Sequence, residues 1–218
     1  MEFTLGKTPS GRELLIEAQP GEYDAQPLLE RIQIDAVPLS LHPDRLATAL
    51  CLLFGRGASG SFTLPAPGCA QNVALAIERF NAPTRVGVAP VNLVPNRVGL
   101  GGEVLRLACP ELGLPETPGS EGMLLSVQGP GKLIGMMATL RSLTVGTNAL
   151  VLGAPARSAL ERILPALGIA VLFCEDLQAS SILLPRSIAG GGDGNDASLL
   201  ESVRQLLDAS GLKIAVSN

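Results

Sequence analysis

A glycine-rich turn between two apolar segments is the first place where this sequence could bind a ligand. Met123–Val127 is a short apolar run typical of a buried strand, and the following Leu133–Leu143 predicts a helix. Gly129, Gly131 and Lys132 stand at the expected helix start, where free N–H groups and the positive end of the helix dipole favour a phosphate or carboxylate. We therefore predict a site for a small anionic molecule, such as a nucleotide; the alternative is an ordinary strand-to-helix turn.

This turn departs from the phosphate-binding loop of P-loop nucleotide hydrolases. Ser126 stands where that motif has its first glycine, and Leu133 replaces the Ser or Thr that would contact magnesium. The sequence therefore predicts neither a particular nucleotide nor a cofactor.

Three further candidate ligand-binding residues follow apolar runs that predict strands. Gly153 comes after Ala149–Leu152, whereas Glu175 and Asp176 come after Ile169–Cys174. Ligands of open α/β sheets bind beyond the carboxyl ends of the strands, so we expect these residues beside the turn at 128–132. The two carboxylates could hold a metal ion or a ribose hydroxyl, or they are ordinary exposed loop carboxylates.

Cys69 and His42 are the two side chains with the chemistry of a nucleophile and a general base. Cys69 stands at an expected helix start, where the dipole favours the thiolate, but a small buried cysteine is the alternative. His42 could act as a base oriented by Asp44, or this stretch could simply cap a helix through Ser40 or Asp44. The four cysteines form no CxxC pair and His42 is the single histidine, so we predict no metal site.

The stretch Asn148–Leu177 predicts the element that would position these groups: a strand, a helix and a second strand. Leu160, Ile163, Leu164 and Leu167 recur at helical spacing, Gly168 is a typical helix stop, and Pro165 predicts a kink or an early end. Ile169–Cys174 is continuously apolar, as in a parallel sheet covered by helices. The alternative is a pair of strands in an antiparallel α+β sheet.

The rest of the chain predicts further strands and helices of an α/β fold. Met1–Ala18 indicates a β-hairpin and Arg31–Val37 a half-exposed strand. We expect the other helices and strands at the following positions: helices beginning at Ser40–Asp44 and over Cys69–Phe80 and Ala197–Ala209; strands over Ser61–Leu64, Arg85–Ala89, Gly99–Ala108, Ser181–Leu184 and Leu212–Val216. The expected architecture is a mostly parallel open sheet with helices on both faces.

A segment dense in proline and glycine, residues 110–122, is the best candidate for a linker. It predicts two lobes, residues 1–112 with the hairpin and residues 120–218; the alternative is one domain of 1–218 with a long surface loop.

Composition limits the classes of partner. Hydrophobic residues make up 46% of the chain and charged residues 17%, the net charge is −4, and no run of Lys or Arg occurs. This pattern argues against binding to nucleic acids and to anionic membranes. No apolar run reaches the roughly 18 residues of a membrane span and no signal-peptide core precedes residue 15, so we expect a cytoplasmic protein.

Two functional hypotheses of different classes remain, and the sequence predicts no reaction. The first is a protein that binds a small anionic metabolite or nucleotide, with or without chemistry. The second is a non-catalytic protein, either structural or a degenerate relative of an enzyme, because charge is sparse and only one histidine is present. The large aliphatic content also suggests self-association as a homo-oligomer.

Overall fold

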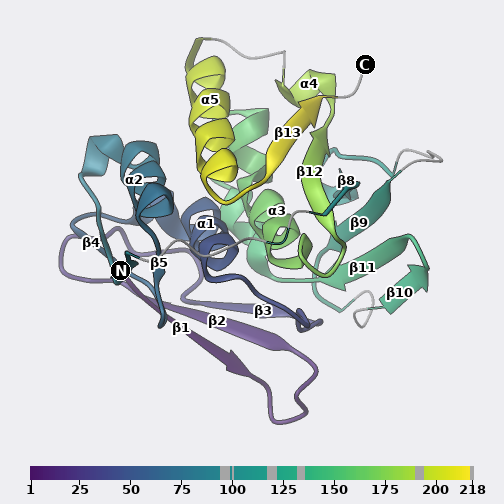
Figure 1. The fold of residues 1–218 in the computed structure, drawn as a ribbon, viewed down its shortest axis with the longest axis horizontal. Helices are drawn as coiled ribbons and strands as arrows, with labels where there is room; N and C mark the ends of the chain where they lie inside the picture. Colours follow the sequence, from purple (N-terminus) through teal and green to yellow (C-terminus); the bar gives the residue numbers. More distant parts are fainter. Residues whose placement is uncertain (94–98, 100, 117–121, 132–135, 190–193, 217–218) are drawn as a thin grey trace.

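In the computed structural model, which describes residues 1–93, 99, 101–116, 122–131, 136–189 and 194–216, the chain opens with three antiparallel strands (Figure 1). β1 (Glu2–Lys7) and β2 (Leu14–Gln19) form the predicted hairpin, and β3 (Arg31–Ile34) pairs with β2. Ile32 and Ile34 of β3 are buried while their neighbours are exposed, as the alternation predicts.

Two parallel strands complete this first sheet. β4 (Ser61–Thr63) pairs with β1, and β6 (Gly87–Ala89) pairs with β4, which gives the order β3-β2-β1-β4-β6. The helix α2 (Gln71–Phe80) provides the crossover between β4 and β6. β5 (Cys69–Ala70) and β7 (Val91–Asn92) form a separate short parallel pair.

A second sheet of six strands has the order β10-β11-β9-β8-β12-β13. Its pairs are parallel except β10 with β11. The strands are β8 (Glu103–Ala108), β9 (Met123–Gln128), β10 (Met136–Thr139), β11 (Ser142–Gly146), β12 (Ala179–Leu184) and β13 (Lys213–Val216). The expected α/β class, with parallel sheets flanked by helices, is therefore confirmed.

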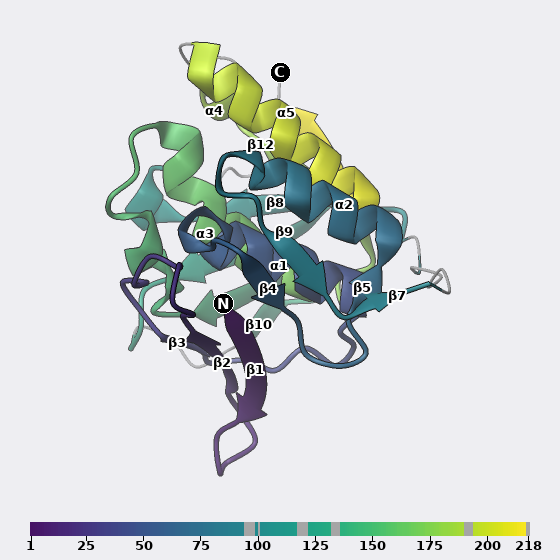
Figure 2. The same cartoon turned by 90° about the vertical axis from the view of Figure 1, so that its left-hand side faces the viewer.

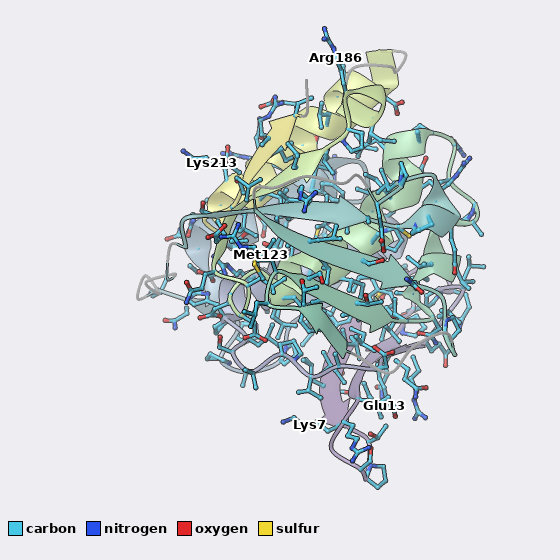
Figure 3. The ribbon with its side chains drawn as sticks, turned by 90° about the vertical axis from the view of Figure 1, so that its right-hand side faces the viewer. Lys7, Glu13, Met123, Arg186 and Lys213 are labelled. Atoms are coloured by element: carbon cyan, nitrogen blue, oxygen red, sulfur yellow. The ribbon has the colours of Figure 1, made fainter. Side chains whose placement is uncertain are left out.

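The longer helices pack against one another as well as on the sheets. α1 (Pro43–Phe54) contacts α3 (Ala159–Phe173), and α2 contacts α5 (Gly194–Ala209), which runs beside it in Figure 2. The ring of Phe54 on α1 lies 5.5 Å from that of Phe3 on β1, whereas α3 contacts β8 and β9. Figure 3 shows the second sheet from its other side, with α3 behind it.

The strand–helix–strand unit predicted over Asn148–Leu177 is wrong in both of its strands, whereas its helix is present. Ala149–Gly153 is a 3₁₀ helix (η4), and α3 is a single helix that runs through Pro165 and Gly168 to Phe173. All residues from 163 to 174 are buried, so the run interpreted as a buried strand is a helix enclosed on all sides. A short apolar run has no polar face, and periodicity therefore cannot separate these two structures.

Gly168 is a packing residue and not the helix stop that we predicted. A Cβ atom at Gly168 would lie 3.0 Å from Leu53 Cγ and 3.2 Å from the carbonyl oxygen of Ala49, both on α1. Glycine therefore allows the two helices to approach closely. Pro165 leaves the helix without one backbone hydrogen bond, and burial of the surrounding apolar side chains outweighs that loss.

The helix predicted over Leu133–Leu143 is also wrong where the structure describes it. Residues 136–139 form β10 and residues 142–146 form β11, which pair as an antiparallel hairpin. Residues 132–135 lie outside the described residues. Thr144 and Val145 are β-branched and pack well in a pleated sheet, which favours the strand.

The division into lobes 1–112 and 120–218 stays a prediction. β8, which belongs to the first range, lies between β9 and β12 of the second range. Buried side chains of both ranges also belong to one hydrophobic cluster. These contacts favour the alternative of one domain over residues 1–218.

A short helix, α4 (Arg186–Ala189), and α5 follow β12. None of the described helices is long and apolar enough to cross a membrane.

We expect Gly168→Leu to lower the free energy of unfolding by about 2 kcal/mol, because the new side chain must push α1 and α3 apart. Urea denaturation followed by circular dichroism measures this loss. Ala159→Leu is the control, because it adds a similar bulk at the exposed start of α3. Equal losses in the two variants would contradict the close helix contact.

Candidate functional site

Two carboxylates that follow α3 hold the segment of chain that leads into α1. Leu39 N–H donates to Asp176 Oδ2 at 2.7 Å, and the N–H and Oγ of Ser40 donate to Asp176 Oδ1 at 2.9 and 3.2 Å. His42 N–H donates to Glu175 Oε2 at 3.0 Å. We call Leu39–His42 the lead-in segment. The two carboxylates that we predicted to bind a ligand thus bind the chain itself.

His42 caps α1. Its Nδ1 accepts a hydrogen bond from Asp44 N–H at 3.2 Å, in the position that a Ser or Asp side chain usually fills. The buried Asp44 carboxylate accepts from Ala70 N–H through Oδ1 at 2.7 Å, and its Oδ2 lies 3.9 Å from His42 Nδ1. A cap at this helix start is confirmed, but the capping side chain is that of His42 and not that of Ser40 or Asp44.

Cys69 is a buried thiol rather than a thiolate. Burial raises its pKa to about 12, and the negative charges of Asp44 and Glu78 add to the rise. The pKa values of Cys51, Cys109 and Cys174 are raised by burial as well. The structural interpretation of Cys69 is therefore the one that the geometry supports.

Arg45, in the first turn of α1, is a buried cation with few partners. Its side chain is 1% exposed and donates through Nη2 to the carbonyl oxygen of Gly99 at 3.3 Å. Among the described residues, its Nε and Nη1 have no acceptor, and neither has the buried hydroxyl of Thr48 one turn later. These atoms are sealed from solvent. Arg45 is thus enclosed and does not face an open ligand site.

The glycine turn after β9 already holds an acidic side chain of the chain. Gly129 N–H donates to Glu111 Oε1 at 3.0 Å. The amide that we expected to bind an anionic ligand is thus bonded to a carboxylate of the chain itself. Gly131 adopts a left-handed conformation, with φ of 84°, and is exposed. Lys132 lies outside the described residues. A ligand at Gly129 would have to displace Glu111.

The predicted site residues do not form one cluster. The turn at Gly129 follows the carboxyl end of β9, whereas Glu175 and Asp176 precede the amino end of β12. β9, β8 and β12 are parallel neighbours, so these two groups lie at opposite ends of the sheet. Gly153 lies in η4 against the backbone of Arg162 on α3. We placed Glu175 and Asp176 beside the turn at Gly129 because we predicted a strand at 169–174. Since that stretch belongs to a helix, the two carboxylates do not follow the carboxyl end of a strand.

A groove with a volume of about 640 Å³ opens between the end of the first hairpin and the chain before α1. One wall comes from the β1–β2 hairpin and the other from the segment after β3. We call it the hairpin groove, and its lining residues are Lys7, Gly11, Arg12, Asp35, Ala36, Val37, Pro38 and Leu39.

The hairpin presents Lys7 and Arg12 on one face. Side chains alternate along a strand, so Lys7 shares a face with Phe3 and Leu5, and its partner in register is the buried Leu14. Arg12 stands two residues before Leu14 and therefore continues the same face. Neither cation forms an ion pair with any residue in the described part of the chain.

The turn between Lys7 and Arg12 is closed by hydrogen bonds within the turn itself. Thr8 N–H donates to the carbonyl oxygen of Glu13 at 3.1 Å, and Gly11 N–H donates to that of Thr8 at 2.7 Å. Gly11 has a φ of 70°, a conformation that glycine adopts without strain. Figure 3 shows Lys7 and Glu13 at the projecting end of this hairpin.

The opposite wall of the groove is mainly apolar, and along its middle it pairs with none of the described strands. At one end, Asp35 N–H donates to the carbonyl oxygen of Gly146, and Gly146 N–H donates to Asp35 Oδ1. At the other end, the wall runs into the lead-in segment held by Asp176. Ala36, Val37 and Pro38 lie between these two ties. The groove thus combines two cations with an aliphatic surface.

The sequence contained one signal for this groove that we did not use. Lys7 and Arg12 flank the turn TPSG of the predicted hairpin, and both fall on the face that carries Phe3 and Leu14. Both cations are exposed, and their place on this face indicated a polar surface at the end of the hairpin. The opposite wall was not predictable, since it depends on contacts across 137 residues.

We expect Arg45→Met to keep or raise the free energy of unfolding, by up to about 2 kcal/mol, because it removes a buried charge that has no carboxylate partner in the described part of the chain. Thermal and urea denaturation measure the change. Arg56→Met is the control, because Arg56 is half exposed and contacts Glu161 at 3.1 Å. A loss of stability in Arg45→Met would show that the buried guanidinium is stabilising.

No family model, curated protein or solved structure matches this chain. Among the described residues, no group of three or more His, Cys, Asp or Glu side chains is placed to hold a metal ion. We take the hairpin groove, which brings two cations beside an apolar wall, as the candidate functional site.

Proposed function

We propose that this protein binds a small molecule in the hairpin groove, and that the molecule carries a carboxylate or phosphate beside an apolar body. The observation that carries the proposal is the pair Lys7 and Arg12, two exposed cations that line one groove and form no ion pair with the described residues. The opposite wall supplies apolar contacts through Val37 and Pro38.

Charge and size support this ligand class. The whole chain has a net charge of −4, yet the groove lining contains two cations and one carboxylate. Arg12 can donate two parallel hydrogen bonds to a carboxylate or phosphate, and Lys7 can add a third. The volume of about 640 Å³ lies within the range of small-molecule sites.

The ligand class is the one that the sequence predicted, but the place differs. The turn at Gly129 lacks its predicted helix, and its amide is bonded to Glu111. In the hairpin groove, Lys7 and Arg12 form no ion pair with a carboxylate of the described residues. Binding, with or without a reaction, is all that these residues support.

Phenyl phosphate is a suitable probe, since it joins a phosphate to an apolar ring. We expect Lys7→Ala and Arg12→Ala each to weaken its binding about tenfold, the usual effect of losing one hydrogen bond between charged groups. Isothermal titration calorimetry measures both affinities.

Lys213→Ala is the matched control, because it removes the same charge from an exposed residue on β13 at the other end of the molecule (Figure 3). Its affinity for phenyl phosphate should stay within twofold of the unaltered protein. Failure of the unaltered protein to bind, or equal losses in all three variants, would refute the groove as the site.

A second candidate function is self-association through the outer face of the six-stranded sheet. Leu183, Arg106 and Leu124 lie side by side across β12, β8 and β9, and Leu183 and Leu124 are only half buried. We expect sedimentation velocity to show a dimer that Leu183→Lys converts to a monomer. A monomer at all concentrations of the unaltered protein would exclude this candidate.

A further inference from the structure

The apolar wall of the hairpin groove is held in place from a distant part of the chain. We propose that Asp176 is a positioning residue for ligand binding: its carboxylate fixes the wall at Leu39 so that a ligand contacts both walls at once. This inference rests on the proposed function. It concerns the geometry of the groove, whereas the proposed function concerns its cations.

One carboxylate receives three hydrogen bonds from two successive residues of the wall and lead-in segment. Asp176 Oδ2 accepts from Leu39 N–H, which belongs to a residue that lines the groove, and Oδ1 accepts from both donors of Ser40. Bonds to an ionised carboxylate are stronger than bonds between neutral groups. The side chain of Leu39 itself is 94% exposed, so packing does not hold this position.

The two walls are anchored independently. Lys7 and Arg12 are fixed by the pairing of β1 with β2, whereas the wall after β3 is tied at Asp35 and at Leu39. A ligand that spans the groove needs a constant separation between phosphate-binding cations and apolar wall. Without the hydrogen bonds to Asp176, one end of that wall is free to move. Ligand binding must then order the wall, and the free energy that this ordering costs weakens the affinity.

Asp176 and its neighbour Glu175 form a natural matched pair for an experiment. Both side chains are half buried, and both carboxylates accept from the lead-in segment. Glu175, however, contacts His42, which is not part of the groove lining. Replacing either residue by alanine changes the net charge by the same amount.

The experiment measures phenyl phosphate and inorganic phosphate binding by calorimetry to the unaltered protein, Asp176→Ala and Glu175→Ala. Removal of a negative charge alone would strengthen binding of an anion in both variants. We expect Asp176→Ala to bind phenyl phosphate at least fivefold more weakly and Glu175→Ala to bind it as well as the unaltered protein. Inorganic phosphate, which lacks the ring that needs the apolar wall, should change less than twofold in Asp176→Ala.

Several results would overturn the inference. These are unchanged or tighter phenyl phosphate binding by Asp176→Ala, equal losses in both variants, or equal losses of both ligands in Asp176→Ala. If Asp176→Ala does not fold, Asp176→Asn replaces it, and we again expect weaker binding of phenyl phosphate. The asparagine NH₂ group cannot accept hydrogen bonds, so the bonds from Leu39 or those from Ser40 are lost. Failure of the unaltered protein to bind either ligand would refute the proposed function, and this inference with it.

Discussion

The close contact between α1 and α3 is the constraint on which the rest of the structure depends. Because Gly168 has no side chain, the Ala49 carbonyl oxygen and the Leu53 side chain of α1 can pack directly against the backbone of α3. This contact brings the carboxyl end of α3 beside the amino end of α1. Asp176 and Glu175 can therefore reach the lead-in segment, and the groove acquires its second wall.

Elements with one clear polar face were predictable from the sequence. The alternation of Ile32 and Ile34 gave a strand, and the spacing of Val203, Leu206 and Leu207 gave a helix, because each pattern has one period. The stretch 169–174 has no polar face, so strand and helix were equally compatible with it, and Pro165 and Gly168 favoured the wrong choice. Their local preferences are outweighed by burial of the whole helix.

The candidate site was only partly predictable for a related reason. From the sequence we expected Glu175 and Asp176 to bind a ligand, whereas in the structure they accept hydrogen bonds from backbone N–H groups more than 130 residues away. Gly129 likewise binds an anionic group, and that group is the Glu111 carboxylate of the same chain. Lys7 and Arg12 gained significance only when the fold placed an apolar wall opposite them.

The most direct test of the account is a titration of ¹⁵N-labelled protein with phenyl phosphate, followed by two-dimensional NMR. The account predicts that amide shifts change at Lys7, Gly11, Arg12 and Val37–Leu39 (except Pro38, which has no N–H), and not at Gly129 and Gly131. Changes confined to Gly129 and Gly131 would contradict it and return the anionic ligand to the turn after β9.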